Sequence, residues 1–230
     1  MSGIVGILNV DGQPVSPSLL ASLSARLAHR GPDHYGQWIN GAAGLACHLL
    51  RVTPESATET QPLVHPSGVT LVFDGRLDNR DEILTHIHDE PDITTHAPDT
   101  VLILALYRRH GERFVEHLTG DFALALYDPM QRVLLLARDA LGVRPLYYTR
   151  IRNSFLFASE IKALLAHPEV VARPNDDMLA CYVSSVRPAD ASLTCFQNIY
   201  CLMPAHLARV TQDSFSTRQY WDFSAADLRL

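Results

Sequence analysis

The fold is decided by residues 122–158, which read FALALYDPMQRVLLLARDALGVRPLYYTRIRNSFLFA. This stretch contains four segments with the two-residue period or the continuous apolar character of buried strands. The segments are Phe122–Tyr127, Val133–Ala137, Leu146–Thr149 and Phe155–Ala158. The turn-forming pairs Asp128-Pro129 and Arg152-Asn153 lie between them. The stretch therefore predicts short antiparallel strands joined by hairpin-like turns.

Helices and further strands are predicted on both sides of this region. The strand patterns lie at Ile4–Val10, Gly44–Leu50, Val69–Phe73, Ala205–Val210 and Thr217–Trp221. The helix patterns lie at Pro17–Ala28, 79–88, Thr100–His110, after Ser159 and at Asp176–Val183. Helices grouped before and after a run of strands favour an α+β fold with largely antiparallel sheet over alternating βαβ units.

Composition narrows the class of protein. The chain has 230 residues, of which 47% are hydrophobic and 19% charged, so it can form one sizeable core and is not disordered. Its 19 basic and 25 acidic residues are scattered, which argues against a nucleic-acid partner. Apolar runs fall far short of the roughly 20 residues that a membrane span needs. Four cysteines without a CxxC pair and an apolar start that lacks a basic flank predict reduced thiols in the cytoplasm.

Seven short blocks in a fixed order carry a family resemblance. They are SGIVGI (2–7), HRGPDHYG (29–36), TQPL (60–63), FDGRLDN (73–79), LTGDFALALYD (118–128), ARDALGVRPLYY (137–148) and FASEIKALL (157–165). Together they resemble the N-terminal glutaminase domain of asparagine synthetases, a class II glutamine amidotransferase of the N-terminal-nucleophile hydrolase type. The FDGRLDNRDE stretch is also similar to a divergent branch that includes β-lactam synthetases and lasso-peptide cyclases.

The resemblance implies a four-layer αββα sandwich of two mainly antiparallel sheets over residues 1–223. Residues 224–230 would begin the linker to a C-terminal synthetase domain, whose phosphate-binding SGG-type loop the sequence lacks. The chain would then be an excised domain or a fragment. ATP and Mg²⁺ are expected only in that second domain, and no cofactor in this one. The resemblance leaves open whether the domain forms a homodimer.

The positions that carry the family's chemistry depart from its pattern. In the family a cysteine that follows the initiator Met attacks the side-chain amide of glutamine, with its own α-amine as general base. The corresponding residue here is Ser2. An asparagine and a glycine form the family's oxyanion hole, whereas this chain has Asp74 and Gly75. Arg76 replaces a glutamate that helps to hold the substrate's α-ammonium.

Two positions that would recognise glutamine are kept. Arg51 matches the family arginine that pairs with the α-carboxylate, and Asp99 matches a carboxylate that receives the α-ammonium. The resemblance therefore predicts a glutamine site whose recognition positions are partly intact and whose catalytic positions have changed.

Three explanations of these departures compete. An engineered Cys→Ser trap would alter residue 2 alone, so the changes at Asp74 and Arg76 favour natural loss of glutaminase activity. The domain would then be a scaffold that packs on the synthetase domain. The alternative is an active glutaminase, in which Ser2 attacks glutamine after Met1 is removed and supplies ammonia for asparagine synthesis.

Other polar residues have simpler interpretations. The histidine pairs, such as His86 with His88, lack a cysteine or carboxylate set at ligand spacing, so no metal site is predicted. Arg30 and Asp33 are predicted to fix the turn at Gly31-Pro32.

Overall fold

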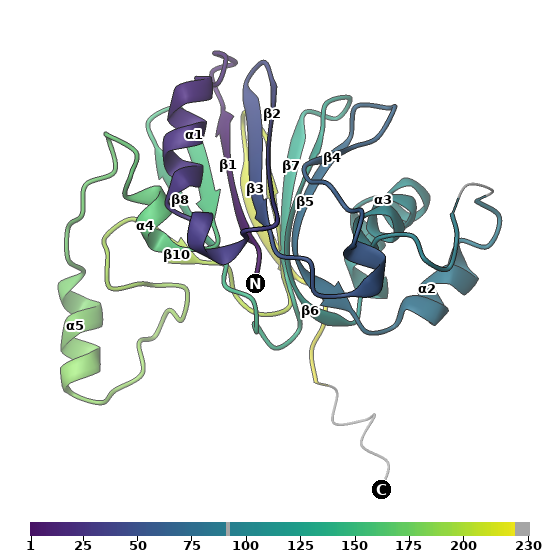
Figure 1. Cartoon of the computed structure of the whole chain (residues 1–230). Coiled ribbons are helices and arrows are strands. Elements are labelled where there is room, and N and C mark those ends of the chain that lie inside the picture. Colours follow the sequence, from purple (N-terminus) through teal and green to yellow (C-terminus); the bar gives the residue numbers. More distant parts are fainter. Residues whose placement is uncertain (91–92, 224–230) are drawn as a thin grey trace, which may run out of the picture.

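Two six-stranded antiparallel sheets stack face to face in the computed structural model, which describes residues 1–90 and 93–223 (Figure 1). The first sheet has the order β10 (Ile199–Cys201), β8 (Tyr147–Ile151), β9 (Ser154–Ala158), β1 (Gly3–Asn9), β3 (Ala43–Leu49) and β2 (His34–Asn40). The second sheet has the order β12 (Phe215–Gln219), β11 (His206–Val210), β7 (Val133–Arg138), β6 (Gly120–Asp128), β5 (Thr70–Leu77) and β4 (Leu63–Val64).

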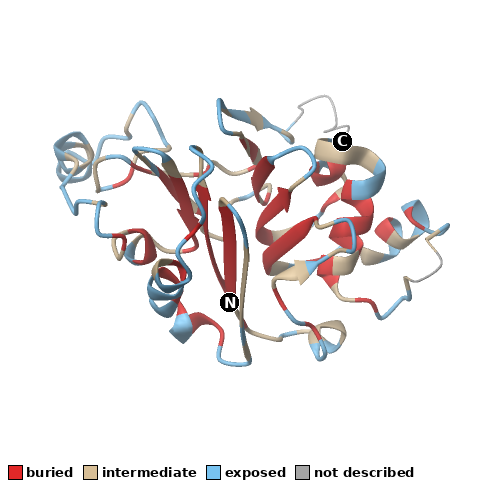
Figure 2. Ribbon diagram, turned by 90° about the horizontal axis from the view of Figure 1, so that it is seen from above, coloured by how far each residue is buried: buried red, intermediate tan, exposed pale blue. Residues whose placement is uncertain are grey.

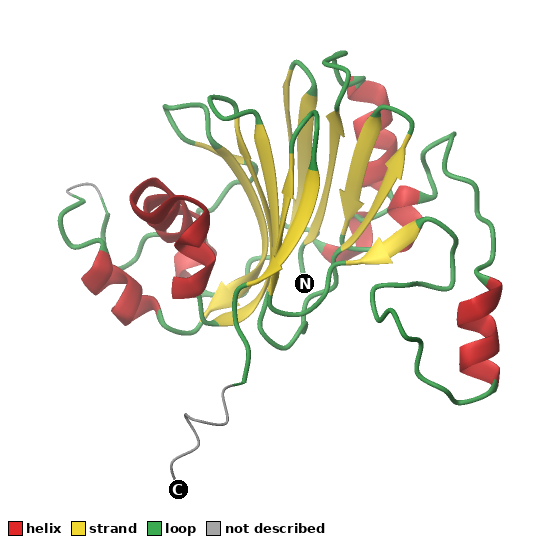
Figure 3. Ribbon diagram, turned by 180° about the vertical axis from the view of Figure 1, so that it is seen from behind, coloured by secondary structure: helices red, strands yellow, loops and turns green. Residues whose placement is uncertain are grey.

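Helices cover the outer faces of both sheets (Figure 3). Helices α1 (Pro17–Ala25) and α4 (Ile161–Leu164) lie on the first sheet, and α2 (Arg80–His86) and α3 (Asp99–His110) lie on the second. Helix α5 (Asp176–Val183) projects beyond the first sheet. The described residues also form three short 3-10 helices: η1 (Ala28–Arg30), η2 (Pro54–Ser56) and η3 (Gly111–His117). The predicted αββα sandwich is confirmed.

The buried apolar residues of the described chain form three cores: between the second sheet and its helices, between the two sheets, and between the first sheet and its helices. The strand pattern of the sequence explains this arrangement. In β6, Phe122, Leu124 and Leu126 face α3, whereas Ala123 and Ala125 face the other sheet. Both faces are buried between Phe122 and Tyr127, so this part of the strand is apolar, and its side chains alternate between cores. Figure 2 shows buried residues concentrated on the sheets, with exposed residues on α5 and the loops.

Some predicted boundaries were wrong. The helix predicted for Pro17–Ala28 begins where Ser16 caps it but ends at Ala25; Arg26 and Leu27 form a turn, and Ala28 begins η1. The strand predicted to end at Phe73 continues through Asp74-Gly75 to Leu77. Strand β2 was not predicted, because its half-buried residues give no apolar alternation. Residues 224–230, predicted to begin a linker, lie outside the described residues.

Within the described part of the chain, none of the helices combines the length and the apolar character that crossing a membrane requires.

Candidate functional site

A small pocket lies at one end of the gap between the sheets, where β1 begins and β5 ends. Its lining comprises Ser2, Leu49, Leu50, Val52, Thr53, Ser56, Glu59, Gln61, Phe73, Gly75 and Asp99. The cavity volume is about 10 Å³, which is the room that one water molecule needs. The pocket thus brings together three of the predicted site residues: Ser2, Gly75 and Asp99.

Ser2 is held in place from two sides. It is 4% exposed, because the strand that follows it pairs with β3. Its Oγ accepts a hydrogen bond from the backbone N–H of Leu50 at 3.0 Å, and its carbonyl oxygen accepts one from Nε of Arg30 at 2.7 Å. The hydroxyl therefore keeps its own hydrogen to donate. Neither neighbour is a base that could remove that proton.

The α-amino group of Met1 lies among charged side chains. Partial burial lowers the pKa of this amine; Asp74 opposes the shift, and Arg144 and Arg30 add to it. Removal of Met1 would leave a free α-amino group on Ser2. This amine is the general base of an N-terminal-nucleophile mechanism, and it would lie near the same charged side chains.

Asp74 faces the space between the two sheets. Its neighbour two residues earlier, Val72, belongs to the inter-sheet core, and side chains two residues apart in a strand share a face. Asp74 is 1% exposed; its Oδ2 accepts from Nη2 of Arg30 at 3.0 Å, and its Oδ1 lies 3.8 Å from Nη1 of Arg144. Burial raises the pKa of Asp74, while Arg144 and Arg30 act against the rise.

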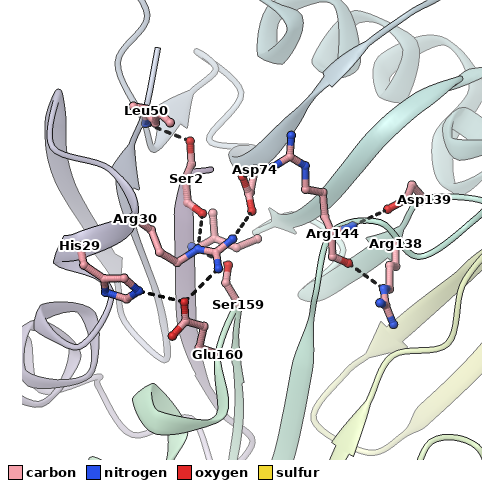
Figure 4. A network of polar contacts seen from close by, with 11 residues as sticks. Ser2, His29, Arg30, Leu50, Asp74, Arg138, Asp139, Arg144, Ser159 and Glu160 are labelled. Carbon is pink, nitrogen blue, oxygen red and sulfur yellow. Dashed lines mark hydrogen bonds and ion pairs between the residues drawn. The ribbon is translucent and has the colours of Figure 1, made fainter. Parts of the chain in front are cut away.

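Arg30 joins the two sheets through a buried polar network (Figure 4). Besides Ser2 and Asp74, its guanidinium contacts Oε1 of Glu160 at 2.9 Å. Partial burial would raise the pKa of Glu160, but hydrogen bonds from Lys162, Arg30 and His29 outweigh it and lower that pKa to about 2. Arg30 was predicted to fix the turn at Gly31-Pro32; its side chain instead contacts Ser2, Asp74 and Glu160, at the centre of the site.

The loop after β7 holds Arg144 toward Asp74. The carboxylate of Asp139 accepts hydrogen bonds from the backbone N–H groups of Leu141, Val143 and Arg144 at 2.9–3.1 Å. Nε of Arg138 donates to the carbonyl oxygen of Arg144 at 2.7 Å. These bonds fix the loop backbone, so the ARDALGVRP stretch positions the second cation of the site.

Gly75 occupies a crowded position opposite β6. A Cβ added there would collide with the carbonyl oxygen of Asp121 and come within 2.8 Å of Cα and Cβ of Phe122. We expect Gly75→Ala to lower the free energy of unfolding by about 1–3 kcal/mol, as overpacking does. Urea denaturation followed by circular dichroism measures this change. An unchanged midpoint would contradict the crowding.

The predicted recognition residues are engaged with other groups. Nε and Nη2 of Arg51 both donate to the carbonyl oxygen of Glu59, at 3.3 and 2.8 Å. Asp99 accepts the backbone N–H of Leu77 at 2.8 Å and forms an ion pair with Arg80.

Arg76 shares the face of β5 with Asp74, but it lies near the end of the strand, is exposed to solvent and is absent from the pocket lining. Its guanidinium is 3.1 Å from Asp78 and 3.9 Å from Asp121, and all three side chains are partly solvent-exposed. A pair of this kind in water contributes little to stability.

Sequence reasoning missed Glu59 and Gln61. Both are buried and line the pocket. Oε1 of Gln61 accepts the backbone N–H of Phe73 at 2.7 Å, and Oε1 of Glu59 accepts from the hydroxyl of Thr100 at 2.6 Å. The signal in the sequence was the TQPL block, which contains Gln61 and follows Glu59 directly.

Comparison with known proteins identifies the family. The model of the glutamine amidotransferase domain family matches residues 1–221, and the chain belongs to this family. It is 33% identical over 228 residues to the amidase chry2 of Gibberella zeae, covering 96% of this chain and 32% of that protein. It is 30% identical over 226 residues to asparagine synthetase [glutamine-hydrolyzing] 3 of Bacillus subtilis, covering 96% and 37% respectively.

The chain therefore spans about a third of the length of these curated relatives. Among solved structures, the glutamine phosphoribosylpyrophosphate amidotransferase of B. subtilis superposes with a TM-score of 0.67 at 16% identity, over 95% of this chain and 49% of that one. This likeness shows the fold, which is that of an N-terminal-nucleophile hydrolase. The predicted relationship is confirmed: the chain is a class II glutamine amidotransferase domain related to asparagine synthetases and fungal amidases.

Proposed function

We propose that this domain keeps the class II amidotransferase fold and an amino-acid pocket but hydrolyses glutamine weakly or not at all. The observation that supports this proposal is the carboxylate of Asp74, which contacts Arg30 and faces Arg144. Negative charge develops on the amide oxygen of glutamine during attack, and an oxyanion hole stabilises that charge with N–H donors. A carboxylate held by two guanidinium groups offers no N–H donor. Of the two predicted oxyanion positions, only Gly75 retains one.

The serine at the nucleophile position is a second reason to expect weak glutamine hydrolysis. A serine hydroxyl is a far weaker nucleophile than a thiolate unless a base removes its proton during attack. The Ser2 hydroxyl already accepts the N–H of Leu50, and the only base that the mechanism provides is an α-amine, whose unperturbed pKa is about 8. Burial, together with Arg144 and Arg30, lowers the pKa of the amine at this end of the chain, and Asp74 only opposes that shift. The deficit therefore lies in the serine hydroxyl and not in the base.

The proposed role is that of a scaffold domain in an asparagine-synthetase-like, ATP-dependent amide-forming enzyme. Support comes from the relatives, one of which is named a glutamine-hydrolysing asparagine synthetase and is about three times as long as the match. ATP and Mg²⁺ would bind to a C-terminal synthetase domain, and this domain would pack against it. The four free cysteines fit a cytoplasmic enzyme.

Glutamate release from glutamine tests the proposal. We expect the native chain to release no more glutamate than a Ser2→Ala chain, which has no nucleophile at this position. A chain carrying Ser2→Cys, Asp74→Asn and Arg76→Glu should release glutamate above both, and intact mass must show that Met1 is absent from every sample. Release by the native chain as fast as by the restored chain would overturn the proposal and make Ser2 an efficient nucleophile.

A further inference from the structure

We propose that Glu59 is the ammonium-binding residue of the pocket and that the pocket takes a free α-amino acid through this carboxylate. The inference rests on the proposed function in one respect: the pocket beside Ser2 is taken as the amino-acid site. It assigns to Glu59 the place that the resemblance gave to position 76.

The charge balance of the pocket carries the argument. Glu59 is 7% exposed, and the donors to its Oε1 are the neutral hydroxyl of Thr100 at 2.6 Å and the neutral amide of Gln61 at 3.3 Å. Across residues 1–90 and 93–223, no ion pair involves its carboxylate. The nearby guanidinium of Arg51 donates to the backbone carbonyl of Glu59 instead. A buried carboxylate without a cation is unfavourable, so a ligand that brings a cation would be bound strongly.

Asp99 is less suited than Glu59 to bind the ammonium group of a ligand. One of its oxygens forms an ion pair with Arg80, and the other accepts the backbone N–H of Leu77. The negative charge of Asp99 is therefore already balanced within the protein. Among the described residues, Glu59 is thus the carboxylate of this pair that no ion pair balances.

The pKa of Glu59 agrees with this charge balance. Burial raises the pKa of Glu59, and the charge of Asp99 adds to the rise, while hydrogen bonds from Thr100 and Gln61 and the charge of Arg51 act against it. An ammonium group beside the carboxylate would lower the pKa of Glu59 again.

The position of Glu59 also fits a substitution for the missing glutamate. Arg76 is exposed near the end of β5 and pairs with Asp78 and Asp121, whereas Glu59 enters the pocket from the segment between η2 and β4. A carboxylate thus reaches the pocket from a different part of the chain. Together with Asp99, it restores two carboxylates to the lining.

Entry of an amino acid requires movement of the pocket wall. The cavity holds about one water molecule, and part of its wall is the short segment that includes Val52, Thr53 and Ser56. Val52 is 60% exposed. Displacement of this surface segment would open the pocket without disturbing the sheets.

Calorimetric titration with two ligands tests the inference. The probes are L-glutamine and glutaramic acid, which has the same skeleton without the α-amino group. We expect native protein to bind glutamine and to bind glutaramic acid at least about tenfold more weakly, since a hydrogen bond to a charged group is lost. Glu59→Gln should weaken glutamine binding by about tenfold or more and leave glutaramic acid binding unchanged.

Glu169→Gln is the matched control, because Glu169 is partly exposed and pairs with Arg152 away from the pocket. It should bind glutamine as the native chain does. Equal binding of the two ligands by native protein, unchanged glutamine binding by Glu59→Gln, or no glutamine binding at all would each overturn the inference. The ligand comparison needs only native protein, so misfolding of Glu59→Gln would not remove the test. Hydrolysis is measured separately, so a failure here is distinguishable from a failure of the proposed function.

Discussion

Replacing Arg30 by methionine should lower the free energy of unfolding by about 3–5 kcal/mol, the loss expected when one partner of a buried ion pair is removed. The side chains of Arg30 and Asp74 are 7% and 1% exposed. Without Arg30, the ion pair left to Asp74 among the described residues is that with Arg144, at 3.8 Å, and both Glu160 and the carbonyl oxygen of Ser2 lose a donor. Urea denaturation followed by circular dichroism measures the change.

Two further variants separate the ion pair from general damage. Arg113→Met removes an arginine that is 78% exposed and pairs with Glu116, and its effect should stay below about 1 kcal/mol. Adding Asp74→Leu to Arg30→Met removes the stranded carboxylate and should recover part of the loss. The explanation fails if Arg30→Met destabilises the protein no more than Arg113→Met does.

The sheets could be predicted from sequence because their strands are buried in a regular pattern. The apolar runs of β6, β7 and β9 follow directly from burial of both strand faces. Strand β2 escaped prediction because its position depends on pairing with β3 and on the close approach of Gly36 to the carbonyl oxygen of Gln61. Neither contact produces a periodic pattern of apolar residues in the sequence of β2 itself.

The site could be predicted only in part, for a related reason. The resemblance pointed to Ser2 and Gly75, which do line the pocket. It could not show that Arg30 lies against Asp74, because their contact joins segments 44 residues apart. Whether a buried charge is balanced by an opposite charge depends on such contacts between distant segments. For the same reason, the sequence did not reveal that the carboxylate of Glu59 forms no ion pair within residues 1–90 and 93–223.

Restoring an amide at position 74 should have the largest effect on catalysis. On a Ser2→Cys background, we expect Asp74→Asn to raise the rate of glutamate release by about 10²–10³, which is the contribution of one oxyanion-hole donor. The new amide nitrogen can donate to the developing oxyanion beside the N–H of Gly75. The amide oxygen can still accept the hydrogen bond from Arg30 that now goes to Oδ2 of Asp74.

The control for this experiment is Asp121→Asn on the same Ser2→Cys background. Asp121 lies on the neighbouring strand opposite Arg76, and its side chain is 35% exposed, so neutralising it removes one charge without adding a donor to the site. Its rate should equal that of Ser2→Cys alone. If Asp121→Asn raises the rate of glutamate release as much as Asp74→Asn does, the effect comes from the change in net charge and not from a new donor. Equal rates for Ser2→Cys with and without Asp74→Asn would mean that residue 74 does not contact the oxyanion, because a donor correctly placed there cannot leave the barrier unchanged.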